Sequence, residues 1–229
     1  GQQQRVALAR SLAKRPKILL LDEPLGALDK KLRQQTQLEL VNTLEQVGVT
    51  CIMVTHDQEE AMTMATRVAI MSEGQLQQVG TPSDVYDFPN SRFTAEFIGE
   101  TNIFEGTVVD DHADYAIIQC PELDVPVRID HGLGGPTEQN LWLSIRPEDI
   151  DLYKEKPESM GDYNWAQGTV EESAYLGSFA VYHVILPSGK IIKSTVASSR
   201  WYLAEEEPPT WDETVYINWP ENQPTPLLR

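Results

Sequence analysis

The sequence predicts an α/β domain followed by a second domain that is mostly β-structure. Two continuous apolar runs, at residues 17–21 (KILLL) and 50–55 (TCIMVT), are typical of parallel strands buried on both faces. Apolar residues at helical spacing separate the two runs, as in a strand, helix, strand unit. Beyond residue 99 the pattern changes to short β-rich segments separated by turns. Because 229 residues exceed the usual length of one domain, we expect domains at 1–99 and 100–229.

The first domain alternates helical patterns with strands, in the order of a largely parallel sheet. A helical pattern follows residue 5, and Gly48 stands where the helix between the two apolar runs would end. Thr81 and Pro82 suit the N-cap and first position of another helix. The other expected elements are a strand at 67–71, a turn at 73–74 and a helix at 91–98.

The second domain reads as a small barrel or sandwich of short strands. The expected strands are residues 104–109, 115–119, 125–129, 141–145, 169–175, 180–186, 191–196 and 214–219, with turns at 132–136, 187–189 and 208–209. A polar loop at 154–163 divides this domain into two lobes. No repeat strong enough to settle how the lobes pair is evident from the sequence alone.

Charge and cysteine usage exclude some functions. The net charge is −17, and residues 100–229 hold 8 basic against 23 acidic residues. Such acidity disfavours nucleic acid as a partner, because phosphate backbones are bound through basic patches. It could attract cations, although solubility is the simpler explanation. Cys51 and Cys120 lie far apart without metal-ligand spacing, and no apolar run resembles a membrane span or signal peptide, so we expect an intracellular, soluble chain.

The sharpest local motif is the hexapeptide LLLDEP at residues 19–24, a hydrophobic strand that ends in two carboxylates and a proline. Open α/β sheets bind their ligands at the carboxyl ends of parallel strands. In P-loop ATPases an aspartate at this point helps to hold magnesium, and an adjacent glutamate can polarise the attacking water. Alone, Asp22 and Glu23 could equally begin a loop or cap the next helix.

Three further motifs accompany LLLDEP: GQQQR at residues 1–5, GALD at 26–29, and His56-Asp57 at the end of a strand. In this order and spacing the set resembles the C-terminal half of the nucleotide-binding subunit of the ABC (ATP-binding cassette) family. The resemblance implies that Asp22 is the Walker B aspartate, which binds Mg²⁺, and that Glu23 is the catalytic glutamate. His56 would be the switch histidine, which contacts the γ-phosphate of ATP and holds the attacking water against Glu23.

The resemblance also implies residues that bind the nucleotide across a dimer. Gly1 and Gln2 match the last two positions of the LSGGQ signature, which serves the ATP of the opposite subunit in a head-to-tail dimer. A glycine there lets backbone N–H groups at a helix N-terminus approach a phosphate. Asp29 would belong to the D-loop, with the N-cap of the helix that begins near Lys30 as its alternative role.

The sequence contains no phosphate-binding loop. That loop requires G-x-x-x-x-G-K-[ST], and the only Gly-Lys pair, Gly189-Lys190, reads as a hairpin turn. The first part of the signature is missing too. We therefore expect this chain to be an N-terminally truncated piece of a longer subunit that does not hydrolyse ATP unaided.

The β-rich extension points to an importer. Exporter ATPases commonly end soon after the region of residues 74–80, whereas residues 80–99 here resemble the junction before a TOBE (OB-like) domain. Residues 143–149 (LSIRPED) resemble a recurring segment of that domain. The fold implied is the C-terminal portion of an ABC ATPase domain, a P-loop NTPase fold, followed by an all-β TOBE domain.

Residues 174–184 resemble the ATPases of polyamine importers, of the putrescine type in particular. Importers of iron(III), sugar or sulfate share the architecture and stay open as alternatives. The expected partners are a second ATPase subunit, transmembrane permease subunits and, indirectly, an extracytoplasmic solute-binding protein. The expected location is peripheral, on the cytoplasmic face of the bacterial inner membrane.

Two readings from other classes remain. Residues 100–229 could act as a regulatory or ligand-sensing module that is independent of hydrolysis. A soluble ABC ATPase of ribosomes or DNA repair is disfavoured by the acidic extension and the lack of a basic patch.

Overall fold

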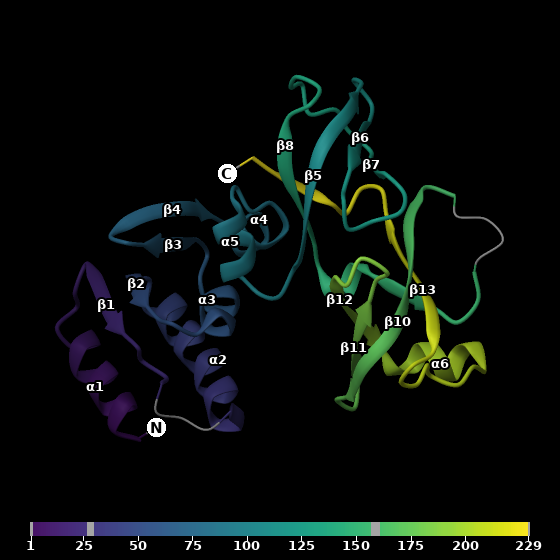
Figure 1. Ribbon diagram of the computed structural model, residues 1–229. Helices are drawn as coiled ribbons and strands as arrows, with labels where there is room; N and C mark the ends of the chain where they lie inside the picture. The colour runs from purple at the N-terminus through teal and green to yellow at the C-terminus, as the bar shows by residue number, and fades with distance from the viewer. Residues whose placement is uncertain (1, 27–29, 157–160, 229) are drawn as a thin grey trace. The chain divides into compact units, whose positions relative to one another are not determined.

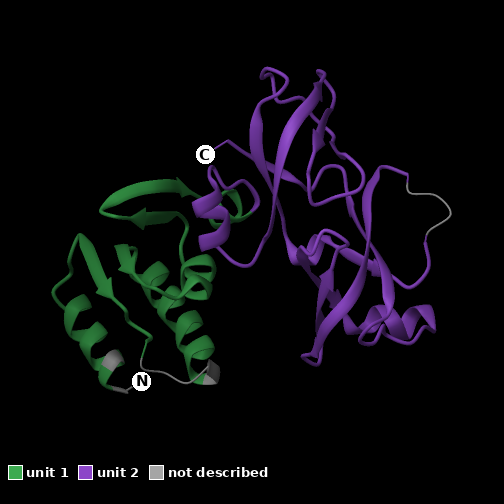
Figure 2. Ribbon diagram, in the orientation of Figure 1, with its two compact units in different colours: residues 1–86 green, residues 87–229 purple. Residues whose placement is uncertain are grey.

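The computed structural model describes residues 2–26, 30–156 and 161–228. The chain forms two compact units, 1–86 and 87–229 (Figure 2). The domain boundary between residues 99 and 100 stays a prediction.

The first unit contains a strand, helix, strand segment that forms a parallel pair. β1 (Ile18–Asp22) is followed by α2 (Lys30–Val47) and then by β2 (Thr50–Val54), which lies parallel to β1 with Leu20 opposite Ile52 (Figure 1). Gly48 ends α2 with a positive φ of 67°, and its N–H donates to the carbonyl of Leu44. The other elements of this unit are α1 (Gln2–Leu12), α3 (Gln58–Met64), the antiparallel pair β3 (Val68–Ser72) and β4 (Gln75–Gly80), and α4 (Pro82–Asp87), which crosses the boundary.

The apolar runs of β1 and β2 are not buried on both faces, contrary to the prediction. Leu19 is buried, whereas Ile18, Leu20, Ile52 and Val54 each keep more than half of their surface exposed. Every second residue of both strands is exposed, so one apolar face of this pair is uncovered. In the described residues β1 pairs with β2 alone.

The second unit begins with α5 (Arg92–Phe97), whose N-cap is Ser91, and continues as two five-stranded antiparallel sheets in the described residues. The strands of the first sheet, in spatial order, are β14 (Thr225–Leu227), β8 (Asn140–Ile145), β5 (Asn102–Asp111), β6 (Ala116–Gln119) and β7 (Val127–Ile129). Those of the second are β9 (Asp151–Tyr153), β13 (Thr214–Pro220), β10 (Tyr163–Tyr175), β11 (Phe179–Ile185) and β12 (Ile191–Ala197). A short 3₁₀ helix, η1 (Pro147–Asp149), precedes β9, and α6 (Ser198–Ala204) follows β12.

The two sheets are related by an internal repeat. The run β5, β6, β7, β8 has the same sheet order as β10, β11, β12, β13, and the last short strand of each half, β9 or β14, lies in the other sheet. β5 and β10 share the sequence N-x-x-x-G-T-V, at 102–108 and 164–170, and each has a register shift directly after it. The sequence analysis did not detect this repeat, because only a few positions are identical.

The repeated asparagines join the two sheets. The side chain of Asn102 accepts from the N–H of Lys193 (2.8 Å) and donates to its carbonyl (2.9 Å). Asn164 makes the same pair of bonds with the backbone of Arg128, both at 2.8 Å. The apolar side chains of both sheets form one core, in which the rings of Phe104 and Trp219 stack with centroids 6.1 Å apart.

Candidate functional site

The carboxyl ends of β1 and β2 bring the sequence-predicted carboxylates and histidine together. Asp22 is the last residue of β1 and lies opposite Val54, the last residue of β2. The N–H of Glu23 donates to the carbonyl of Val54 at 2.9 Å, which continues the parallel ladder by one bond. Glu23 has a positive φ of 41°, so the chain turns sharply at this carboxylate.

Glu23 and His56 are in direct contact. The Nδ1 atom of His56 lies 3.0 Å from Oε1 of Glu23, and 74% and 56% of the two side chains are exposed. An ionised carboxylate only accepts, so Nδ1 carries the proton in this contact and Nε2 remains for another partner. Because both groups are solvated, the pair itself contributes little to stability.

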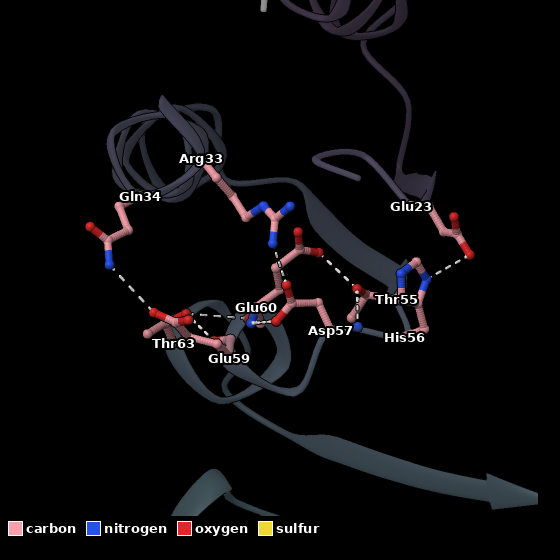
Figure 3. A network of polar contacts seen from close by, with 9 residues as sticks. All are labelled: Glu23, Arg33, Gln34, Thr55, His56, Asp57, Glu59, Glu60 and Thr63. Atoms are coloured by element: carbon pink, nitrogen blue, oxygen red, sulfur yellow. Dashed lines mark hydrogen bonds and ion pairs between the residues drawn. The ribbon is translucent and has the colours of Figure 1, made fainter. Parts of the chain in front are cut away.

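The residues on either side of His56 are fixed by a polar network (Figure 3). Thr55 donates from its hydroxyl to Oε2 of Glu60 at 2.7 Å, and the N–H of Asp57 donates back to that hydroxyl at 3.0 Å. Glu60 is 1% exposed. The network therefore anchors the backbone of His56 to a buried carboxylate of α3.

A second anchor connects this segment to α2. Nη1 of Arg33 donates to Oδ2 of Asp57 at 2.7 Å, while Oδ1 of Asp57 accepts from the N–H of Glu60 at 3.2 Å and caps α3. One carboxylate thus serves both a helix N-terminus and a cation.

The sequence analysis missed α3 and these anchoring residues. Asp57 and Glu60 stand at the spacing of a capping box, which was the available signal. Arg33 carries no such local signal, because its partner lies 24 residues away along the chain.

The other predicted site residues, Gly1, Gln2 and Asp29, have no side chain among those that the structure describes. Gly1 and Asp29 lie outside the described residues, and of Gln2 only its place at the start of α1 is described. Their roles in nucleotide binding stay predictions.

The donor set at the end of β1 fits magnesium in one respect. Asp22 offers an exposed carboxylate, a hard oxygen ligand, and Mg²⁺ is commonly bound through one or two carboxylates with water and substrate phosphates. Within the described ranges, no three His, Cys, Asp or Glu side chains gather as they would around a metal held by protein groups alone.

The described helices include none with both the length and the apolar character of a membrane span.

Comparisons with known proteins cover both units. Residues 1–26 match the ABC transporter family model, and residues 143–224 match the TOBE domain model. The "Putrescine transport ATP-binding protein PotG" of Escherichia coli (strain K12) is 49% identical over 219 residues, which is 96% of this chain and 57% of that protein.

Two further relatives share the name "Spermidine/putrescine import ATP-binding protein PotA". That of Thermotoga maritima is 42% identical, over 96% of this chain and 59% of that protein. That of Rubrobacter xylanophilus is 48% identical, over 82% of this chain and 49% of that protein. The chain thus spans between about half and three-fifths of the length of these relatives. The predicted fold class is confirmed: the chain joins part of an ABC ATP-binding domain to a TOBE domain, and over most of its length it is similar to the ATP-binding proteins of ABC transporters.

Proposed function

We propose that the whole protein containing this chain hydrolyses ATP to drive the uptake of a polyamine. The observation that carries the proposal is the contact between Glu23 and His56 beside Asp22, at the carboxyl ends of two parallel strands. The names of the relatives support a polyamine as solute, with putrescine first.

Each residue would have a separate task. Asp22 would hold Mg²⁺, which would neutralise charge on the phosphates of ATP. Glu23 would orient the attacking water and accept its proton. His56, donating from Nδ1 to Glu23, would keep that carboxylate in place, and its Nε2 would donate to the substrate's γ-phosphate once it carries a proton as well.

Nucleotide binding would also involve Gly1 and Gln2 from the opposite subunit and Asp29. We propose the partners accordingly: a second ATPase subunit in a head-to-tail dimer, and permease subunits that hold the complex at the cytoplasmic face of the membrane. A solute-binding protein would select the polyamine outside the cell.

The test is ATP hydrolysis with Mg²⁺ by residues 1–229 beside a version extended upstream through a phosphate-binding loop. Residues 1–229 contain no such motif, so we expect hydrolysis by the extended version alone. A folded, extended version that stays inactive even with its permease subunits would contradict the proposal. Uptake of labelled putrescine, compared with iron(III), sugar and sulfate, tests the solute.

A further inference from the structure

A groove of about 830 Å³ lies in the second unit, between α6 with the loop that follows it and the ends of β10 and β11. It is built by a segment that the first half of the repeat lacks. In that half, β7 and β8 are joined by residues 130–139, which contain no helix, whereas α6 and residues 205–213 join β12 and β13.

Aromatic rings form both the floor and the rim of this groove. Tyr182 and Trp201 are buried at the floor and meet edge to face with centroids 6.4 Å apart. Tyr175, Tyr202 and Trp211 line the groove while keeping 75%, 84% and 65% of their surfaces exposed. So much exposed aromatic surface around one hollow is unusual on a protein that needs it only for packing.

The groove contains one charge of its own. Glu206 is the single charged side chain among the described residues that line it. Its backbone N–H donates to the carbonyl of Trp201 at 3.0 Å, which ties the backbone of this residue to α6. The nearest cation in sequence, Arg200, does not line the groove: its Nη1 lies 2.8 Å from Oδ1 of Asp151, and its guanidinium stacks on the ring of Trp201 at 5.3 Å from the centroid.

Two polar atoms of lining residues are also left unused. The Oγ of Ser198 and the Nε1 of Trp201 are buried without a hydrogen-bond partner in the described part of the chain, and of the two only the hydroxyl can accept. Such a hydroxyl can accept a bond from a ligand that donates.

We propose that this groove binds an organic ammonium cation. Aromatic faces attract cations through the ring quadrupole, and the Glu206 carboxylate supplies the opposite charge. An anion would be repelled by that carboxylate, and a bare metal ion would find a single hard ligand. An ammonium ion that carries methylene groups uses the rings, the carboxylate and the free hydroxyl together.

The test is titration calorimetry of residues 1–229 with 1,4-diaminobutane, using 1,4-butanediol as the neutral isostere. The choice of a diamine rests on the proposed function, whereas the cation chemistry rests on the groove and needs no ATP hydrolysis. We expect saturable binding of the diamine that weakens with salt, and no comparable binding of the diol.

Two matched pairs of variants locate the site. Glu206→Gln and Tyr202→Ala should each weaken binding about two- to fivefold, the size that a charge contact or a cation–π contact reaches at an exposed site. As controls, Glu207→Gln makes the same charge change at the neighbouring residue, and Leu203→Ala removes an exposed side chain. Neither residue lines the groove, so both variants should bind the diamine normally.

Four results would overturn the proposal: no saturable binding, equal binding of the diol, equal losses in the control variants, or self-association of the chain through these aromatics that the diamine leaves unchanged. Because binding is measured without nucleotide, a failure here is distinguishable from a failure of the ATPase proposal.

Discussion

Asn102 and Asn164 make the same contact from equivalent positions of the two sheets. Each amide bonds to both the N–H and the carbonyl of one residue on an edge strand of the other sheet, Lys193 for Asn102 and Arg128 for Asn164. Both side chains are buried. The contacts are reciprocal: the central strand of each sheet is bonded to the edge of the other.

Removing either amide should destabilise the second unit. Asn102→Ala and Asn164→Ala would each leave a half-buried N–H and carbonyl without their side-chain partner, at a cost of about 1–3 kcal/mol. Urea unfolding measures the change, and Asn140→Ala, at an exposed asparagine of β8, is the matched control. A loss no larger than that of the control would show that the amides do not hold the sheets together.

The shared glycines should tolerate alanine unequally. A Cβ on Gly168 would lie 2.8 Å from the carbonyl oxygen of Ile185, a backbone atom that cannot move without disturbing β11. On Gly106 the closest clash, at 2.3 Å, is with the side-chain Cγ2 of Ile118, and the nearest backbone oxygen is 3.4 Å away. We expect both substitutions to cost about 1–3 kcal/mol, with Gly168→Ala the more severe. Thermal unfolding of both variants decides the order, and a milder Gly168→Ala would contradict this reasoning.

Replacing Glu23 tests the proposed catalytic role. In the extended protein, Glu23→Gln cannot accept a proton from water, so turnover should fall by about 10²–10⁴-fold while ATP binding persists. Size-exclusion chromatography with ATP should then detect an accumulated dimer. Glu45→Gln makes the same charge change on an exposed face of α2 and should leave turnover unchanged. Normal turnover in Glu23→Gln would show that this residue is not the catalytic base.

The ion pair between Arg33 and Asp57 should show measurable coupling. In a double-mutant cycle with Arg33→Met and Asp57→Asn, we expect about 0.5–1 kcal/mol, because 30% and 23% of the two side chains are exposed. Asparagine keeps the N-cap of α3, so Asp57→Ala should cost about 1 kcal/mol more than Asp57→Asn. Additive single effects in urea unfolding would mean that the pair does not link α2 to the segment of His56.

Asp149 should make the second unit less stable as the pH rises. Burial raises the pKa of Asp149 from 3.8 to about 6; the charges of Glu148 and Asp87 add to the rise, and Arg146 opposes it. Between these two pH values the folded state binds more protons than the unfolded state, so stability falls with increasing pH and the loss is complete above about pH 6.

The variant Asp149→Asn removes that proton linkage. Its stability relative to the original chain should rise between pH 4 and about pH 6 and then stay constant, as measured by urea unfolding at several pH values. Glu155→Gln, at an exposed position, should give a flat difference over the same range. A flat difference for Asp149→Asn as well would refute the link between burial and titration.

The sequence by itself determined which polar residues stand at the end of β1, and most of the elements. LLLDEP and His56 are local signals: an apolar run fixes a strand, and the polar residues that follow it must lie at the strand's carboxyl end. Helix ends were predictable for the same reason, since Ser91 and Gly48 act on neighbouring backbone groups. The hydrogen bonds made by such capping residues reach only a few residues along the chain, so the local sequence is enough to predict them.

Only the tertiary structure decided what depends on distant partners. The exchange of β9 and β14 between the sheets, the bond of Arg33 to Asp57 and the groove beside α6 each join segments that are remote in sequence. The local sequence around Asn102 does not predict Lys193 as its partner, because that contact forms only when the two sheets pack together. Likewise, the apolar run of β1 could not reveal that one of its faces would be exposed, since burial is set by the neighbouring elements and not by the strand.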